Sequence, residues 1–246
     1  MKKSIELLSK VLSWFLGFGY GAESLESEIK SFKSFIPNGK VFIDVGANKG
    51  LYTDALMKQF PKFSNVFLFE PSSTNFDILM EKFEKIDGIV LNKQGLAEKN
   101  SDSTLFSDKA GSGLAGLSKR KLDHFGIDFN FKEEIKIIRF DDYWQKENNQ
   151  LAIDLFKIDV EGHELSVLEG VGSIINYIKI IQFEFGGCNI DTRTYFQDFW
   201  YFFKDKNFDI YRITPLGPIH IKKYKESYER FETTNYFCVN NNLSTL

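Results

Sequence analysis

Short apolar segments alternate with amphipathic ones along most of the chain. The apolar segments are predicted to be β-strands at 41–45, 66–70, 89–91, 155–159 and 178–185. Apolar residues at helical spacing follow four of them, at 51–60, 74–83, 164–171 and 195–203. Strands that are apolar nearly throughout are typical of a parallel sheet with helices on both faces. The pattern therefore predicts an α/β fold.

Two stretches break this alternation. Residues 97–150 separate the third and fourth predicted strands by more than a crossover needs, and they contain a β-like segment at 135–138. A long connection of this kind often faces a substrate, so we expect an inserted lid whose Gly111–Gly116 part is mobile. The tail, 210–239, is typical of two strands that close the sheet as an antiparallel pair.

Residues 1–36 are predicted to form a helical extension of one 246-residue domain. Near its start, apolar residues recur at helical spacing: Ile5, Leu8, Leu12, Phe15 and Leu16. Glu6 and Lys10 interrupt the apolar run, no small-residue cleavage site follows, and the run is too short to span a bilayer. We expect an amphipathic helix that packs on the domain; the alternative is contact with a membrane surface or another subunit.

Charge and cysteine content limit the classes of partner and the cellular compartment that the sequence indicates. The net charge is −3, from 31 basic and 34 acidic residues, which does not indicate a nucleic-acid partner. Cys188 and Cys238 lack CxxC spacing, which argues against a disulfide framework or a thiolate zinc site. This cysteine usage fits a reducing, cytoplasmic location.

The segment Asp44–Gly50 joins the first predicted strand to a helix. Gly46 would allow a tight turn close to a ligand, and Gly50 a close approach at the start of the helix. The glycines are four residues apart, so neither the G-x-G-x-x-G dinucleotide pattern nor a P-loop is present. A pyrophosphate site is therefore not indicated.

Glu70 ends the second predicted strand, 20 residues after Gly50 (70 − 50). A carboxylate at this position can accept hydrogen bonds from both hydroxyls of a ribose. An isolated acid at a strand end is commonly just a surface residue, but together with the glycine turn it indicates a nucleoside ligand without pyrophosphate. S-adenosylmethionine is the candidate.

The segment Lys157–Glu164 concentrates ionisable residues at the end of the fourth strand, the edge where open α/β sheets bind ligands. Asp159 ends the strand and Glu161 lies in the turn. Glu164 falls in the first helical turn, where a carboxylate favours the helix dipole, so we expect a structural role. His163 is either an exposed turn residue or a functional one, and the acids beside it favour function.

With these segments, the sequence resembles the FkbM family of methyltransferases. The resemblance runs over about 41–185 and rests on the motifs at 44–52, 69–71, 140–143, 157–164, 167–170 and 182–185. It implies a Rossmann-like methyltransferase fold with a seven-stranded, mostly parallel sheet and one antiparallel strand. It also implies methyl transfer from S-adenosylmethionine to a hydroxyl of a sugar, glycan or related small-molecule acceptor.

The resemblance also assigns roles to individual residues. The turn on the methionine side of the cofactor would be formed by Asp44, Gly46, Ala47, Asn48 and Gly50, with Tyr52 and Pro71 also in contact with the cofactor. Glu70 would bind the ribose, Gln94 and Gly95 would border the adenine, and Asp159 would lie beneath the transferred methyl. The family usually has a small residue at the position of His163, so this chain departs from it there.

The sequence allows alternatives on two points, the activation of the hydroxyl and the function of the chain. The hydroxyl could be activated by His163 or Asp159, with Glu161 nearby, or by a divalent metal held by Asp159, Glu161 and Glu184. If His163 is the base, neighbouring carboxylates are expected to raise its pKa. An NAD-linked oxidoreductase and a non-catalytic adenosylmethionine-binding scaffold are the alternative functions.

Overall fold

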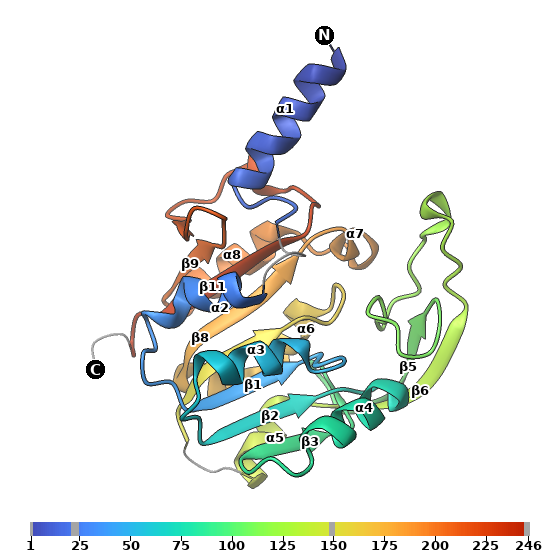
Figure 1. Ribbon diagram of the computed structural model, residues 1–246, viewed down its shortest axis with the longest axis vertical. Helices are drawn as coiled ribbons and strands as arrows, with labels where there is room; N and C mark the ends of the chain where they lie inside the picture. The colour runs from blue at the N-terminus through green and yellow to red at the C-terminus, as the bar shows by residue number, and fades with distance from the viewer. Residues whose placement is uncertain (1, 21–24, 148–150, 244–246) are drawn as a thin grey trace.

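A computed structural model describes residues 2–20, 25–147 and 151–243. Its main sheet has eight strands in the order β10-β9-β11-β8-β7-β1-β2-β3 (Figure 1). In chain order these are β1 (Val41–Val45), β2 (Asn65–Phe69), β3 (Ile89–Asn92), β7 (Ile153–Ile158), β8 (Ile178–Phe185), β9 (Phe208–Arg212), β10 (Ile219–His220) and β11 (Thr234–Asn240). All five central strands predicted from apolar runs are present.

The directions of the strands confirm a mostly parallel sheet. Neighbours among β3, β2, β1, β7 and β8 pair in parallel, whereas β11 runs antiparallel to both β8 and β9. The prediction of seven strands with one antiparallel strand is wrong by one strand. The two-residue β10 adds a short antiparallel edge, because the chain after Pro218 turns back and pairs with β9.

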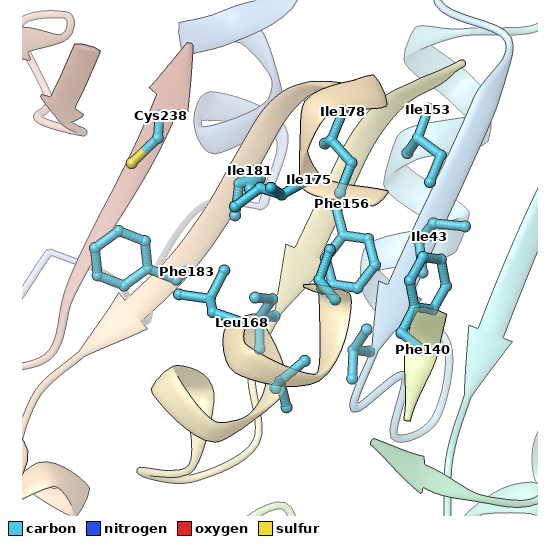
Figure 2. Close-up of a cluster of buried hydrophobic side chains, with 14 of the residues drawn as sticks. Ile43, Phe140, Ile153, Phe156, Leu168, Ile175, Ile178, Ile181, Phe183 and Cys238 are labelled. Atoms are coloured by element: carbon cyan, nitrogen blue, oxygen red, sulfur yellow. The ribbon is translucent and has the colours of Figure 1, made fainter. Parts of the chain in front are cut away.

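Helices cover both faces of the sheet, as predicted. The helices are α1 (Lys2–Phe15), α2 (Leu25–Lys33), α3 (Leu51–Gln59), α4 (Ser73–Phe83), α5 (Phe140–Glu147), α6 (Glu164–Val171), α7 (Cys188–Thr192) and α8 (Phe196–Asp205). Side chains of α2, α3 and α4 pack on the face that carries Phe42, and those of α5, α6 and α8 pack on the face that carries Ile43. Figure 2 shows part of the hydrophobic core on the face that carries Ile43, including Phe140, Phe156 and Leu168.

The insertion at 97–150 contributes to a second, smaller sheet rather than an irregular loop. Its order is β4-β6-β5, from β4 (Gly95–Leu96), β5 (Ser101–Ser107) and β6 (Phe131–Ile138), and Figure 1 shows β5 and β6 beside the main sheet. The β-like segment at 135–138 is part of β6. Strand β5 was missed because its sequence, SDSTLFS, is mostly polar and five of its residues keep some solvent exposure.

The predicted N-terminal helix is present, but only its C-terminal end, at Ser13 and Trp14, packs on the domain. Helix α1 projects from the body (Figure 1), and its only buried residue is Ser13. Leu8 is 59% exposed and Leu12 is 55% exposed. The expectation that the helix packs along its length is therefore wrong, because the apolar side chains of α1 before Trp14 are exposed. Within the described part of the chain, no helix has the length and apolarity needed to cross a membrane.

Candidate functional site

A cavity of about 710 Å³, partly open to solvent, lies at the carboxyl ends of β1, β2 and β7. The predicted site residues that line it are Gly46, Asn48, Glu70, Pro71, Gly95, Asp159, Glu161 and His163. The small sheet and the segment after β5 form its outer wall, through apolar residues that include Leu105, Leu117, Ile135 and Ile137. The fold thus brings the three sequence segments singled out above into one cavity.

The turn after β1 requires glycine for two different reasons. Gly46 has φ +74°, and a Cβ there would lie 1.9 Å from the carbonyl oxygen of Asp159. Its N–H and that of Ala47 both donate to the carbonyl of Phe69, at 2.9 and 3.1 Å. Gly50 has φ +76°, and a Cβ there would meet the ring of Phe83 at 2.3 Å. Gly46 therefore holds the floor of the cavity against β7, and Gly50 lets α3 begin close to α4.

Glu70 is 5% exposed, and its carboxylate is fixed by two backbone donors. Oε2 accepts from the N–H of Asn48 at 2.8 Å, and Oε1 accepts from the N–H of Ser72 at 2.9 Å. Each oxygen keeps acceptor capacity for one further donor. Burial raises the pKa of Glu70 to about 7, although both backbone hydrogen bonds oppose this shift. The carboxyl is oriented to meet a pair of hydroxyl groups.

Several predicted cofactor residues support the cavity without lining it. Asp44 is fully buried and accepts from Thr53 Oγ1 at 2.7 Å, and Lys157 Nζ lies 3.2 Å from its Oδ1. The lining residues likewise do not include Ala47, Gly50, Tyr52 or Gln94. Side chains alternate between the two faces along a strand, so Asp44 points to the same helix-covered face as Phe42. Only the turn that follows it reaches the cavity.

Lys157 is a buried cation to which the sequence reading gave no role. Its Nζ lies 3.2 Å from Asp44 and 3.5 Å from Asp159, and it donates to the carbonyl of Gly46 at 3.4 Å. Burial lowers the pKa of a lysine, but here the coulombic attraction of Asp44 and Asp159 outweighs burial and raises it. Lys157 stays protonated and ties β1 to β7 at the edge of the cavity.

Glu161 and His163 are both held by the inserted segment. Arg120 Nη1 lies 2.8 Å from Glu161 Oε2, and Arg120 Nε lies 3.2 Å from Asp191 Oδ2. Ser118 Oγ lies 2.9 Å from His163 Nε2. Burial, with Asp159 adding to it, raises the pKa of Glu161 to about 8 even though Arg120 lowers it. The turn after β7 is thus latched to the insertion.

The expectation that carboxylates raise the pKa of His163 is wrong. Burial lowers this pKa below its usual value of about 6.5, because desolvation disfavours the imidazolium. His163 is therefore neutral at neutral pH and has a nitrogen able to accept a proton. Asp159 is less buried than His163, since 42% of its side chain is exposed.

The structural role expected for Glu164 fits its contacts. Its Oε1 accepts from the N–H of Val160 at 3.1 Å and from that of Gly162 at 3.0 Å, while the side chain is fully buried. It fixes the turn that carries Asp159 and Glu161.

The residues proposed for a metal do not form a metal site. Among the described residues, no group of three or more His, Cys, Asp or Glu side chains is arranged to hold a metal ion. Of the three acids proposed, Glu161 is engaged by Arg120 and Asp159 by Lys157. The donor set therefore does not fit, and no step is derived through a metal.

Several lining residues were missed by sequence reasoning. Asn75 is buried at the cavity wall, and its Oδ1 has no hydrogen-bond partner among the described residues. Ser112 and Gly113 lie in the expected Gly111–Gly116 segment. Asn75 carries no local signal, since it falls within an ordinary helical pattern and only tertiary structure places it here.

Comparisons with known proteins show which family the chain resembles. The family model described as "Methyltransferase FkbM domain" matches residues 44–210, which cover the turn, Glu70 and the β7 segment. Methyltransferase 1 of Beauveria bassiana is 22% identical over 149 residues, covering 55% of this chain and 59% of the relative. The hexuronic acid methyltransferase AglP of Haloferax volcanii is 28% identical over 142 residues, covering 57% of this chain and 54% of the relative.

Among solved structures, a methyltransferase FkbM from Methylobacillus flagellatus is 18% identical, with a TM-score of 0.48. That match covers 81% of this chain and 44% of the other. The chain thus spans about half to three fifths of the length of the curated relatives named above. With a family model that matches more than half of its residues, the chain belongs to the FkbM family of methyltransferases.

Proposed function

We propose that the chain is an S-adenosylmethionine-dependent methyltransferase that methylates a hydroxyl of a sugar, glycan or related small molecule. The observation that carries the proposal is Glu70, a buried carboxyl held by two backbone N–H groups with one acceptor site left on each oxygen. This arrangement matches the two hydroxyls of a ribose. The glycine turn beside it lines the same cavity through Gly46 and Asn48, and its sequence lacks the glycine pattern of a pyrophosphate cradle.

The proposed placement follows the lining residues along the edge of the sheet. The ribose would lie on Glu70, and the adenine would lie beside Pro71 and Gly95, near Asn75, whose Oδ1 has no hydrogen-bond partner among the described residues. The methionine end would run over Gly46 towards Asp159. When bound, the cofactor supplies a methyl group on a sulfonium, which an oxygen nucleophile can attack in line.

The chain's own residues would position the reactants and exclude water. The latch formed by Ser118 and Arg120 holds the insertion across the cavity, and its apolar wall keeps solvent from the reacting atoms. Positioning of this kind can lower the barrier by roughly 7–11 kcal/mol. Neutral His163 and the partly exposed Asp159 are the candidates to accept the hydroxyl proton.

We also propose a class of methyl acceptor and a cellular location for the chain. One relative is named as a hexuronic acid methyltransferase, which supports a sugar acceptor. The net charge of −3 and the two cysteines, both free and buried, support a non-nucleic-acid acceptor and a cytoplasmic location.

A thermal shift assay tests the cofactor class and discriminates the oxidoreductase alternative. We expect adenosylhomocysteine to raise the melting temperature of the purified chain, because ligand that binds only the folded state stabilises it. NADH at the same concentration should have no effect. Stabilisation by NADH alone would refute the proposal. A non-catalytic scaffold would bind adenosylhomocysteine but methylate none of a panel of sugars.

A further inference from the structure

Helix α1 carries a contiguous set of apolar side chains that the domain does not cover. Each is between 41% and 64% exposed, and the set consists of Ile5, Leu7, Leu8, Val11, Leu12, Phe15 and, just after the helix, Leu16. Single exposed apolar residues are ordinary on a protein surface, whereas a contiguous patch marks a surface that contacts something else.

The base of α1 is fixed to the domain, so the helix is held out from the body. Ser13 Oγ accepts from Arg230 Nη2 at 2.9 Å. The ring of Phe18 lies against two guanidinium groups, 4.1 Å from that of Arg212 and 4.4 Å from that of Arg230. Arg212 ends β9 at the carboxyl edge of the sheet, the edge that also carries the cavity. Beyond this anchor, α1 points away from the body (Figure 1).

The side chains of α1 separate into an apolar and a polar half. Successive residues of a helix are about 100° apart, so the apolar residues, from Leu7 round to Leu16, cover roughly half of the circumference, interrupted by Ser4 alone. The polar half carries Lys2, Lys3, Glu6, Ser9, Lys10 and Ser13. Because Ser13 contacts the domain, the apolar half is turned away from it.

The charge of α1 is opposite in sign to that of the rest of the chain. Its polar half holds three lysines and one acid, Glu6, a net charge of +2 (3 − 1). Since the whole chain has a net charge of −3, the remainder carries −5 (−3 − 2). An anionic surface would therefore attract α1 and repel the body, which makes α1 the element suited to contact it.

Lipid fits this helix better than a second copy of the chain does. A seam between two helices needs only a narrow apolar stripe, and it would leave part of the apolar half of α1 uncovered. Two copies would also bring the same net positive charge together. A helix with a broad apolar face and lysines on its polar face is instead typical of one that lies in the surface of a bilayer. With 14 residues, α1 is too short to cross one.

We propose that α1 binds the chain to the surface of an anionic membrane. The apolar half enters the boundary between headgroups and acyl chains, and the lysines contact lipid phosphates. Because α1 is anchored at the carboxyl edge of the sheet, binding brings this edge, with the cavity, to the lipid side of the molecule. The proposal does not depend on which ligand the cavity holds.

The test is co-sedimentation of the full chain with vesicles of phosphatidylcholine that contain phosphatidylglycerol, compared with vesicles of phosphatidylcholine alone. We expect about tenfold stronger binding to the anionic vesicles, and weaker binding as salt is added, because each basic residue near such a surface contributes about 1 kcal/mol. Amide hydrogen exchange over 2–15 should slow when these vesicles are present, since a helix of this length is marginal in water.

Substitutions on the apolar half test the contact with acyl chains. Leu8→Gln and Leu12→Gln should each weaken binding about tenfold, because a leucine then no longer leaves water. Glutamine has a helix propensity close to that of leucine, so helix formation is little affected. The control is Leu216→Gln, the same change at a residue that is 79% exposed but lies outside α1, and it should bind like the wild type.

Substitutions on the polar half test the charge contact. Lys3→Gln and Lys10→Gln should each weaken binding to anionic vesicles about fivefold, and Glu6→Gln should strengthen it by a similar factor. Lys62→Gln, at an exposed lysine in the turn before β2 on the opposite edge of the sheet, is the control and should change nothing.

Contrary results would overturn the proposal. They are no binding to anionic vesicles, equal binding to both kinds of vesicle, or binding that Leu8→Gln and Leu216→Gln reduce alike. Sedimentation equilibrium without lipid tests the other occupant: a dimer that Leu8→Gln dissociates, together with no vesicle binding, would show that α1 pairs with a second copy. Melting temperatures confirm that each variant is folded.

Discussion

At the scale of single residues, the carboxyls around the cavity divide between shaping the backbone and facing a ligand. Glu164 is buried and accepts hydrogen bonds from the backbone of the turn after β7. Glu70 is fixed by backbone donors yet keeps acceptor capacity on the cavity side. Asp159 is the most exposed of the three acids after β7 and lines the cavity. Contacts, and not residue type, decide these roles.

Gly46 is predicted to be irreplaceable. Gly46→Ala should lower the free energy of unfolding by about 3 kcal/mol or more, since its Cβ would strike the Asp159 carbonyl at a left-handed φ. Gly126→Ala is the matched control, because Gly126 has φ +69° but no atom within 4 Å of a Cβ. It should cost only about 1 kcal/mol. Equal costs in denaturant unfolding would show that the contact with β7 does not matter.

His163 is expected to titrate below its usual pKa of about 6.5, because burial disfavours its charged form. The folded chain then binds the proton more weakly than the unfolded chain does, so His163 reduces stability as the pH falls below about 6.5. NMR titration, with the signal assigned through His163→Gln, measures the pKa directly. A pKa above 6.5 would restore the original expectation that carboxylates dominate.

At the scale of elements, α1 is present without the packing that usually stabilises helices. Isolated helices of its length are marginal in water. Its outward apolar side chains are available to a membrane surface or another subunit. By contrast, α2 buries Ile29 and Phe32 completely against the sheet.

Substitutions in these two helices should therefore differ in cost. Leu8→Ala should change the free energy of unfolding by no more than about 0.5 kcal/mol, because Leu8 is exposed. Ile29→Ala should cost about 2–5 kcal/mol through loss of buried apolar contacts. Chemical denaturation of dilute protein checks both. A large cost for Leu8→Ala would mean that α1 packs on the chain or on a second copy.

The inserted segment is held to the body by a few polar contacts. We expect Arg120→Gln to speed amide hydrogen exchange over 111–120, because Arg120 joins the insertion to Glu161 and Asp191. The neighbouring Lys119 donates to Asn130 within the insertion itself, and the structure, over the residues it describes, gives it no ion pair to the body. Lys119→Gln is therefore the control and should leave exchange unchanged. Identical exchange in the two variants would refute the latch.

Across the whole molecule, local sequence patterns predicted the strands and turns, whereas roles that depend on tertiary contacts could not be predicted. Apolar runs and glycine positions predicted the central strands, the turn at Gly46 and the acid at Glu70, because burial and backbone conformation dictate residue type there. Asn75 and Lys157 could not be found in this way. Their roles depend on which helix or strand lies opposite, and the polar β5 gave no apolar period to detect.

A crystal structure of the chain with adenosylhomocysteine bound would show whether the cavity holds the proposed cofactor. We expect the ribose hydroxyls on Glu70, the adenine beside Gly95 and the sulfur next to Asp159. A ligand bound elsewhere, or a ribose that does not touch Glu70, would contradict this expectation.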